Sequence, residues 1–438
     1  MTRLEVNLSA DMPGHLFGCW IRRTHAASQT KFSTQGVTSP HKWCLPATRH
    51  SGNGFCRLSA LRFSHRGGRK TVWILRPGHY SKPCGFPQKS VRPQEARMLK
   101  SRTVMKVSPG AGNLGIDTRM LAPPREGEVL LKIKRAAICG TDLHIYHWND
   151  WAARNYETPL VLGHEFCAEV LETGPGVTSV SIGQIVSGET HLFCDRCEQC
   201  RANRRHTCLN LRLFSKSGFG CFSDYSVVPA NALRVVPDRI SMDTATVLEP
   251  LGVGVRAAME GDVSGRSVLV TGCGPIGLYT IVAARALGAA SITAVDLSKR
   301  RLEMAIRAGA DEALAPQVPP EFMMTADVDL VIDASGSADA IESAMEMIKP
   351  GGKLLLVGLP GRNLSIPPVR LINREITVTG IYGRLIDETW LEMERLLTSG
   401  RLRLDAIETC EFPMTEFDAA FERAASGTTG KVLFNLDS

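Results

Sequence analysis

Four cysteines at short spacing form the most specific chemical pattern in the chain. They are separated by two, two and seven residues and are Cys194, Cys197, Cys200 and Cys208. Thiolates at this spacing can surround a tetrahedral zinc ion, and four of them leave no position open for water or substrate. Clustering of this kind favours a metal over disulfides. The pattern therefore predicts a structural zinc site, with disulfides or free thiols as the alternatives.

A glycine-rich segment, Gly272-Cys-Gly274-Pro-Ile276-Gly277, follows an apolar run and opens a helical pattern. Its glycines let the backbone approach a pyrophosphate at a helix N-terminus, where unpaired N–H groups point outward. Asp296 ends the next apolar run, 19 residues after Gly277. A carboxylate there can accept hydrogen bonds from ribose hydroxyls and would repel a 2′-phosphate. The segment predicts a dinucleotide site that favours NAD over NADP, although the cations Lys299–Arg301 lie close by.

A third group of residues has weaker spacing but suggestive context. Cys139-Gly-Thr141-Asp-Leu-His144 places a thiol, a hydroxyl and an imidazole on one short segment. His164 and Glu165 follow an apolar run, and Glu249 stands where the chain enters the nucleotide-binding region. A lone cysteine or histidine is more often a buried thiol or a hydrogen-bonded side chain. Their contexts make these residues better candidates for metal ligands than a lone cysteine or histidine would be.

The elements that must position these residues change character along the chain. Apolar runs at 129–134, 160–162 and 166–171 with glycine-rich turns predict a β-rich region up to about residue 240. Strands are then predicted at 267–272, 291–296, 328–333 and 353–357, alternating with helices at 276–287, 299–308 and 338–349. Ser298 is the predicted cap of the second helix. This alternation implies a doubly wound parallel sheet, and Lys431–Phe434 is predicted to be a last strand.

Charge is unevenly distributed over the 438 residues. Residues 1–97 hold 16 Lys and Arg but only 3 Asp and Glu, whereas residues 98–438 hold 35 basic and 41 acidic residues. The mildly acidic body gives no reason to expect a nucleic acid or an anionic membrane as partner. Residues 1–97 lack periodicity, so three interpretations stay open: spurious upstream translation with a true start at Met98 or Met105, a disordered basic extension, or a transit peptide.

From about residue 105 to the end, these motifs together resemble the zinc-containing medium-chain dehydrogenase/reductase family. Within it, the chain is similar to the L-threonine 3-dehydrogenase branch. The segments that carry this likeness are Ala137–Trp148 with Trp151, Gly380–Arg384 with Glu388–Trp390, and the four-cysteine segment.

The resemblance implies an α/β fold in which a GroES-like catalytic domain spans 98–248, completed by 383–438, and a Rossmann domain spans 249–382. Cys139, His164 and Glu165 would hold a catalytic zinc, which makes two zinc ions per chain. Thr141 and His144 would relay the alcohol proton to solvent, and Glu249 would tune the site. The implied NAD contacts are Gly272, Gly274, Ile276, Gly277, Asp296, Arg301, Val357, Gly358, Leu359, Ile381 and Tyr382.

The expected reaction is oxidation of L-threonine by NAD to 2-amino-3-oxobutanoate, in a cytoplasmic homotetramer. The chain departs from the family at Ala168 and Gln184-Ile185, which lie away from the metal, and at Gly252-Val253-Gly254, which lies near the active site. The alternatives are a sorbitol- or xylitol-type polyol dehydrogenase, a non-catalytic redox-sensing or binding protein, and a zinc-ribbon nucleic-acid binder. Arg384 is a candidate for the substrate carboxylate, with a surface or hinge arginine as the alternative.

Overall fold

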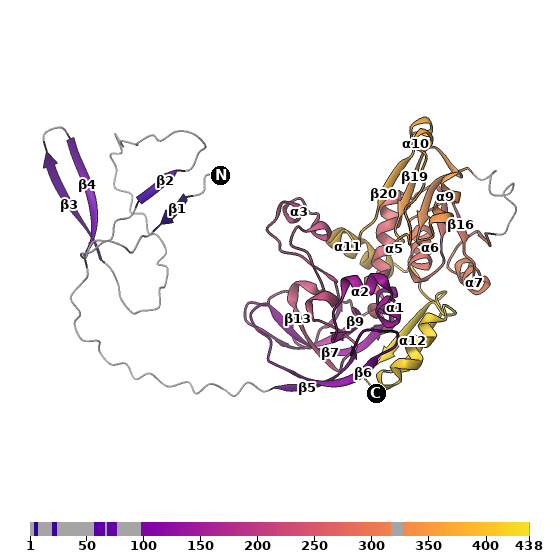
Figure 1. Cartoon of the computed structure of the whole chain (residues 1–438), viewed down its shortest axis with the longest axis horizontal. Coiled ribbons are helices and arrows are strands. Elements are labelled where there is room, and N and C mark those ends of the chain that lie inside the picture. Colours follow the sequence, from indigo (N-terminus) through magenta and orange to yellow (C-terminus); the bar gives the residue numbers. More distant parts are fainter. Residues whose placement is uncertain are drawn as a thin grey trace. The chain divides into compact units, whose positions relative to one another are not determined.

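The computed structural model describes residues 98–316 and 327–437, together with the backbone of four strands nearer the N-terminus (Figure 1). Those strands form two antiparallel pairs, β1 (Leu4–Asn7) with β2 (Trp20–Arg23) and β3 (Arg57–His65) with β4 (Gly68–Arg76). Most of residues 1–97 lies outside the described part, so the three interpretations of that segment stay open. Residues 93–438 form one compact unit of their own.

The first half of that unit is built on a seven-stranded, largely antiparallel sheet. Its order is β14-β10-β9-β7-β22-β21, and β13 also pairs with β7. The bounds are β7 Glu128–Ala137, β9 Glu165–Thr173, β10 Ile185–Gly188, β13 Tyr225–Pro229, β14 Leu233–Val235, β21 Thr409–Pro413 and β22 Lys431–Asn435. β7 and β9 contain the runs predicted as strands at 129–134 and 166–171.

Smaller elements surround this sheet. Three strands form a second sheet, β6 (Leu114–Leu121), β5 (Leu99–Lys106) and β8 (Leu160–Val161), and β11 (His191–Leu192) pairs with β12 (Arg212–Leu213). The helices are α1 Gly140–His147, α2 Asp150–Asn155, α3 Glu198–Arg201 and α4 Met242–Thr246, with 3-10 turns at Arg205–Thr207, Ser215–Ser217 and Ala230–Ala232. One apolar core joins β7, β9 and α1 to Phe421 and Phe434 near the C-terminus.

The second half is a six-stranded parallel sheet in the order β17-β16-β15-β18-β19-β20. Its strands are β15 Ser267–Thr271, β16 Ser291–Val295, β17 Glu312–Leu314, β18 Val328–Asp333, β19 Ile348–Leu356 and β20 Thr377–Gly380. Its helices are α5 Leu248–Gly261, α6 Pro275–Ala286, α7 Lys299–Arg307, α9 Ala338–Met345 and α10 Pro368–Arg374. The predicted doubly wound parallel sheet is confirmed.

Side-chain alternation explains why helices cover both faces of this sheet. Val268 and Val270 of β15 pack into the core that includes residues of α5 and α6, whereas Leu269 packs with residues of α9 on the other face. Successive side chains of a strand point to opposite faces, so strands covered on both sides must be apolar throughout. Ser298 caps α7 as predicted, because its side chain accepts from the Arg301 N–H.

One predicted boundary was wrong. The helix expected at 338–349 ends at Met345, and β19 begins at Ile348 rather than at Lys353. Ile348 pairs with Val328 of β18, and the register then shifts before Lys353 pairs with Leu330. An apolar run at this point fits either a helix or a buried strand, and only the pairing with β18 decides between them.

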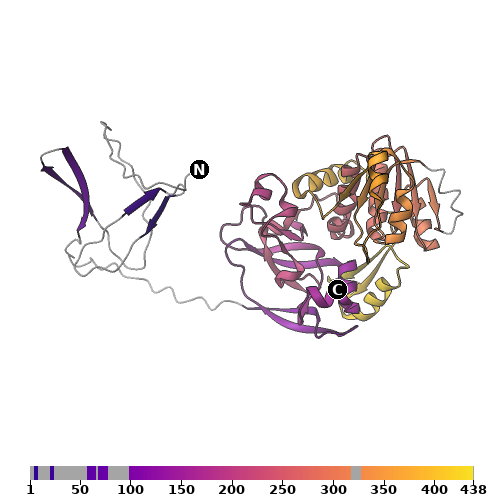
Figure 2. The same cartoon turned by 45° about the horizontal axis from the view of Figure 1, so that its top comes forward.

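The last part of the chain returns to the first sheet. After α11 (Ile386–Thr398), strand β21 pairs with β22, and β22 pairs antiparallel with β7 (Figure 2). Helix α12 (Phe417–Ala425) packs beside both C-terminal strands. Elements of residues 98–248 and 409–435 thus share one sheet, while the exact domain boundaries stay predictions. Among the described residues, no helix is long and apolar enough to cross a membrane.

Candidate active site and zinc centres

The four cysteines predicted to bind zinc converge in space. The sulfur of Cys197 lies 3.5 Å from that of Cys200 and 3.8 Å from that of Cys208, and all four sulfurs lie within 4.8 Å of one another. Ligands at about 2.3 Å from a tetrahedral zinc ion are separated by similar distances. No disulfide joins the cysteines that the structure describes. The donor set and its geometry therefore fit a four-thiolate zinc ion.

Backbone N–H groups stabilise these sulfurs as anions. Those of Cys194 and Asn210 donate to the Cys208 sulfur at 3.4 and 3.3 Å. Hydrogen bonds from the Arg196 backbone and the Asn210 side chain lower the pKa of the Cys194 thiol to about 6. Deprotonated thiols are the form that binds metal, so the loop favours the ligand state of Cys194. Burial and the neighbouring thiols of Cys197 and Cys208 instead raise the pKa of Cys200 to about 12.

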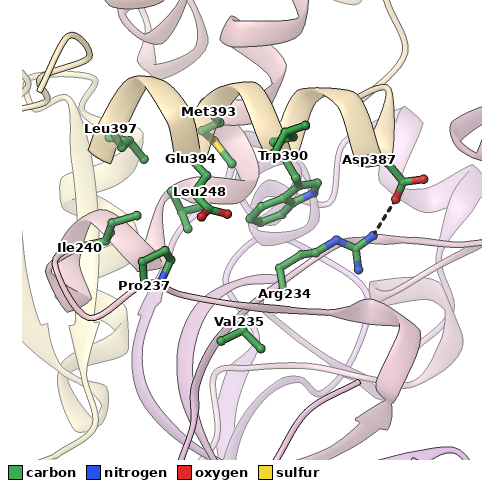
Figure 3. A pocket seen from close by; sticks show the side chains of 11 residues that line it. Arg234, Val235, Pro237, Ile240, Leu248, Asp387, Trp390, Met393, Glu394 and Leu397 are labelled. Carbon is green, nitrogen blue, oxygen red and sulfur yellow. Dashed lines mark ion pairs between the residues drawn. The ribbon is translucent and has the colours of Figure 1, made fainter. Parts of the chain in front are cut away.

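The cysteine lobe, residues 194–208, is fastened to the first turn of α11. Arg205 forms ion pairs with Asp195 inside the lobe and with Asp387 on α11. Asn203 donates to Glu388 at 3.1 Å. Asp387 also lies beside Arg234, and Figure 3 shows this pair at one end of a cavity of about 230 Å³ between α11 and residues 234–240. No predicted site residue lines that cavity.

The second predicted metal site is also brought together. Single ligand atoms of Cys139, His164 and Glu165 lie within 4.8 Å of one another. Cys139 stands at the N-cap of α1, and Glu165 is the first residue of β9. The Nδ1 atom of His164 is buried and has no hydrogen-bond partner. A thiol, an imidazole and a carboxylate whose ligand atoms converge in this way form a donor set that fits a zinc ion.

Asp142, to which the sequence analysis gave no role, bonds to the backbone of both segments that carry the predicted ligands. Its buried carboxylate accepts from the backbone N–H of Cys139 at 3.0 Å and of Gly163 at 3.2 Å, and lies 4.0 Å from His164 Nδ1. One side chain therefore links the segments that carry the thiol and the imidazole. Burial acts to lower the pKa of His164, but the charges of Cys139 and Asp142 raise it well above its usual value.

Glu165 has a partner that the sequence did not reveal. Both of its oxygens contact the Nζ of Lys431 on β22, at 2.8 and 2.6 Å, and both side chains are buried. Burial opposes the charge on Lys431, but Glu165 and Cys139 raise its pKa above the ordinary value. The only sequence signal was a lysine at the start of an otherwise apolar strand. Glu165 therefore reaches the predicted metal position as one member of an ion pair.

Glu249 lies in the first turn of α5 and is held by two side chains. Its Oε1 accepts from Thr190 at 2.8 Å and lies 2.9 Å from Arg384 Nη2. Burial would raise the pKa of Glu249, but the charges of Arg384 and His164 outweigh it and lower the value. The residue is thus kept as a buried carboxylate, and its role near the metal stays a prediction.

Arg384 was a candidate for the substrate carboxylate, with a surface or hinge arginine as the alternative; it is not on the surface, and it joins residues on both sides of the predicted domain boundary. Its side chain is completely buried and is bonded to both oxygens of Glu189, at 2.7 and 2.9 Å, and to the backbone oxygen of Glu249. Trp390 of α11 also donates to Glu189, at 2.9 Å. Because these carboxylates already occupy the guanidinium, it is not available to a substrate carboxylate, and the candidate role is withdrawn.

The predicted proton relay lies on one helix. Thr141 and His144 are three residues apart in α1, so their side chains share a face. The His144 side chain is exposed, and its Nδ1 lies 2.8 Å from Asn149 Nδ2. Burial of part of the ring and the nearby His147 lower its pKa, so the imidazole is neutral at pH 7 and can accept a proton. Among the described contacts, none joins Thr141 directly to His144.

The predicted dinucleotide residues follow the carboxyl ends of parallel strands. Register pairs Thr271 with Val295 and Leu356 with Gly380, so the segments after them meet at one edge of the sheet. That edge is where α/β folds bind ligands. The residues placed there are Gly272, Gly274, Ile276, Gly277, Asp296, Arg301, Val357, Gly358, Leu359, Ile381 and Tyr382.

Each glycine of this turn is required, or useful, for a different physical reason. Gly272 has a φ of +86°, and a Cβ on Gly277 would lie 1.7 Å from the Gly272 carbonyl oxygen. A Cβ on Gly274 would meet nothing within 4 Å, and Gly274 is the N-cap of α6. Two glycines therefore make the turn, and the third leaves the helix N-terminus open to a phosphate.

The carboxylate of Asp296 is bonded to the backbone of this turn. Its Oδ2 accepts from the Cys273 N–H at 2.7 Å and its Oδ1 from the Ser298 N–H at 2.8 Å. Arg300 is bonded to Glu408 at 2.7 Å, and Arg301 donates to the Gly427 carbonyl and lies 3.8 Å from Asp296. Both arginines thus have partners within the chain. Their presence beside Asp296 is therefore weak support for binding of the 2′-phosphate of NADP.

Family models match both halves of this site. The alcohol dehydrogenase GroES-like domain matches residues 125–238, and the zinc-binding dehydrogenase domain matches residues 275–399. L-threonine 3-dehydrogenase of Pyrococcus horikoshii is 40% identical over 345 residues, which cover 77% of this chain and 99% of that protein. The chain belongs to the zinc-containing medium-chain dehydrogenase/reductase family.

Other members of the family agree with this membership. L-threonine 3-dehydrogenase of Coxiella burnetii is 38% identical over 77% of this chain and 99% of its own length. Among solved structures, an alcohol dehydrogenase from Thermus has 27% identity and a TM-score of 0.69, covering 76% of this chain and 99% of its own. A short chain alcohol dehydrogenase of E. coli complexed with NADH has 25% identity and a TM-score of 0.71, with 77% and 99% covered. The predicted fold class and enzyme family are confirmed.

The two glycines of the segment Gly252-Val253-Gly254 are explained by close packing. A Cβ on Gly252 would lie 2.4 Å from the Arg384 side chain, and one on Gly254 would lie 2.6 Å from the backbone of α6 at Tyr279 and Thr280. Gly254 therefore permits α5 and α6 to approach closely. The role of Gly254 in this helix packing gives no direct argument for another substrate.

Proposed function

We propose that this chain oxidises the secondary hydroxyl of L-threonine with NAD, giving 2-amino-3-oxobutanoate. The observation that carries the proposal is the identity of 38–40% to proteins named L-threonine 3-dehydrogenase, over 99% of the length of two of them. The site supports the same chemistry, because it combines a thiol–imidazole pair, a hydroxyl–imidazole pair on α1 and a glycine turn at the end of β15.

Cys139, His164 and Glu165 are the residues proposed to hold a catalytic zinc, and the four-cysteine lobe a structural one. When bound at the first site, zinc supplies a Lewis acid for the substrate hydroxyl. Asp142 accepts from the Cys139 N–H and lies 4.0 Å from His164 Nδ1. Burial raises the pKa of Glu165, and the ion pair with Lys431 opposes that rise. Glu249 adds a carboxylate whose orientation Thr190 and Arg384 fix.

The chain's own proton path begins at Thr141 and leaves by the exposed ring of His144. A neutral imidazole with a pKa below its ordinary value can accept the proton near pH 7 and release it to water. Asp296 would bind the adenosine ribose of NAD and disfavour NADP. The tetramer and the cytoplasmic location expected from the family resemblance stay predictions.

A screen for NADH production by zinc-replete protein tests the proposal. Substrates are L-threonine, 2-butanol, sorbitol and xylitol, with NAD and NADP as separate cofactors. L-Threonine should give the highest kcat/KM, with 2-butanol far lower because it lacks both charged groups. Efficient oxidation of sorbitol or xylitol with no turnover of threonine would replace the proposal by the polyol alternative.

A further inference from the structure

Asp333 is the last residue of β18, and its side chain is completely buried. It was not among the predicted site residues. In the part of the chain that the structure describes, no lysine, arginine or histidine forms an ion pair with it. A buried carboxylate without a cation is costly unless hydrogen bonds replace the water that it loses. The groups that donate to Asp333 therefore show which segments its charge holds together.

Two segments at the end of the parallel sheet donate to this carboxylate. The Thr271 hydroxyl, at the end of β15, donates to Oδ1 at 2.8 Å. The N–H and the hydroxyl of Ser335 donate to Oδ1 at 3.1 and 2.5 Å, and the Gly336 N–H donates to Oδ2 at 3.1 Å. Hydrogen bonds to a charged acceptor are stronger than those between neutral groups. Asp333 thus binds the loop that follows β18 to the end of β15.

The segment that follows β19 packs against the same group. The Gly358 N–H donates to the Asp333 carbonyl oxygen at 2.9 Å. A Cβ on Gly358 would lie 2.2 Å from the Gly336 nitrogen and 2.8 Å from Asp333 Oδ2. A Cβ on Gly272 would lie 2.6 Å from the Ser335 Cα. The glycine turn, the loop after β18 and the segment after β19 therefore pack closely around Asp333.

Two of these three segments carry predicted contacts to NAD. They are the glycine turn, which begins at Gly272, and Val357–Leu359, on the predicted nicotinamide side. Both follow carboxyl ends of parallel strands, the edge where α/β folds bind ligands. Asp333 is buried, and both of its oxygens accept hydrogen bonds from the protein. It can therefore act on a cofactor only through the segments that it holds.

We propose that Asp333 is a positioning residue for NAD, whose carboxylate fixes the glycine turn and residues 357–359 relative to each other and so sets the affinity for the dinucleotide. This inference rests on the proposed function, since it concerns the proposed NAD site. A site that is already ordered binds more tightly, because binding does not have to order it.

Asp333→Asn is the direct test, because it nearly keeps the shape of the side chain. Each carboxylate oxygen accepts from a backbone N–H, of Ser335 or of Gly336. Whichever way the new amide is turned, its NH₂ group faces one of these donors, and two donors cannot bond. The loop after β18 must then move away from the glycine turn or from the segment after β19.

A matched control lies at the other end of β18. The Asp329 carboxylate accepts from the N–H and the hydroxyl of Ser267, the first residue of β15, at 2.8 and 2.7 Å. Like Asp333, it joins β18 to a hydroxyl of β15, but at the edge opposite the predicted site. Asp329→Asn therefore reports the loss of such a bond without a change at the predicted NAD site.

Fluorescence titration gives the Kd of NADH for the zinc-replete wild type and each variant, and thermal unfolding gives the melting temperature. Both Asp→Asn variants should lower the melting temperature. Only Asp333→Asn should raise the Kd, on the order of tenfold, as expected for a lost hydrogen bond to a charged group. The KM for NAD should rise with it, while the KM for threonine stays within about twofold. Ser335→Ala, which removes one hydroxyl donor and keeps the N–H, should raise the Kd about threefold.

A purely structural role would lower the melting temperature and leave the Kd of NADH unchanged. That result in folded Asp333→Asn, or an equal rise of the Kd in Asp329→Asn, overturns the proposal. If Asp333→Asn does not fold, Ser335→Ala decides, and an unchanged Kd there overturns it.

The titration also separates this inference from the proposed function. A wild type that binds NADH but does not oxidise threonine refutes the threonine assignment, and a raised Kd in Asp333→Asn still supports the role of Asp333. A wild type that binds neither NADH nor NADPH overturns both.

Discussion

At the scale of single residues, three of the buried carboxylates at the catalytic centre are matched by buried cations, whereas Asp142 is held by backbone N–H groups. Glu165 is paired with Lys431, while Glu189 and Glu249 share Arg384. A buried charge without a partner costs several kcal/mol, so these cations come from elements distant in the sequence to neutralise the ligand region. The pairing keeps negative charge beside a metal position without leaving it exposed to solvent.

Lys431 gives a direct test of that pairing. Lys431→Met should lower the free energy of unfolding by about 3–5 kcal/mol, because it leaves the Glu165 carboxylate buried and unpaired. Adding Glu165→Gln to this variant should recover part of the loss, since the double variant has no unpaired charge. Urea denaturation of the wild type, the two single variants Lys431→Met and Glu165→Gln, and the double variant measures both effects. A midpoint unchanged in Lys431→Met would mean that the ion pair does not carry this role.

Asp296 sets the expected cofactor preference. Asp296→Asn keeps an oxygen that can accept from the Cys273 N–H but removes the charge that repels a 2′-phosphate. The ratio of kcat/KM for NAD to that for NADP should fall on the order of tenfold, the effect of about 1.4 kcal/mol. Steady-state kinetics with both cofactors checks this. A wild type that uses both equally would show that Asp296 does not discriminate.

At the scale of elements, α11 connects the two proposed metal sites. Its first turn is bonded to the cysteine lobe through Asp387 and Glu388, and its Trp390 donates to Glu189, the partner of Arg384. Figure 3 shows Trp390 and Asp387 on the same helix, with Arg234 opposite. A change in the lobe can therefore reach the buried network through one helix.

Cys197→Ser tests the separate roles of the two sites. It should remove about one zinc per chain and lower the melting temperature, because metal binding at a four-thiolate site is coupled to local folding. Activity should fall partly, through α11. His164→Ala is the contrast: it should abolish turnover and leave the lobe metal and the fold in place. Metal analysis that finds one zinc or fewer in fully active wild-type protein would contradict the two-site proposal.

At the scale of the whole molecule, β5 marks where the described body begins. The strand starts at Leu99, pairs with β6 and β8, and buries Ser101, Thr103 and Val104. Its pairing to β8 reaches the segment just before His164. The two methionines considered as alternative starts therefore differ: Met98 precedes the strand, whereas Met105 lies within it.

A truncation series uses this difference. Protein that starts at Met98 should fold and have the specific activity of the full chain, because β5 is kept whole. Protein that starts at Met105 lacks six residues of β5 and should be poorly folded, since β6 then loses its partner. Circular dichroism, melting temperature and kcat/KM compare the two. Loss of folded enzyme in the Met98 protein would show that residues 1–97 are required.

By itself, the sequence determined the features that depend on local order and short spacing. These are the four-cysteine group, the glycine turn between β15 and α6, the cap at Ser298 and the strand–helix alternation of the parallel sheet. Each arises from residues within about 20 positions of one another, so periodicity and residue type were sufficient.

Only the tertiary structure decided the contacts between distant segments. It paired Glu165 with Lys431, which lie 266 residues apart, and enclosed Arg384 between Glu189 and Glu249. It also bonded Asp333 to the hydroxyl of Thr271 and moved the start of β19 to Ile348. A charged side chain looks the same in sequence whether it faces solvent, substrate or a buried partner, because its role depends on what the fold packs against it.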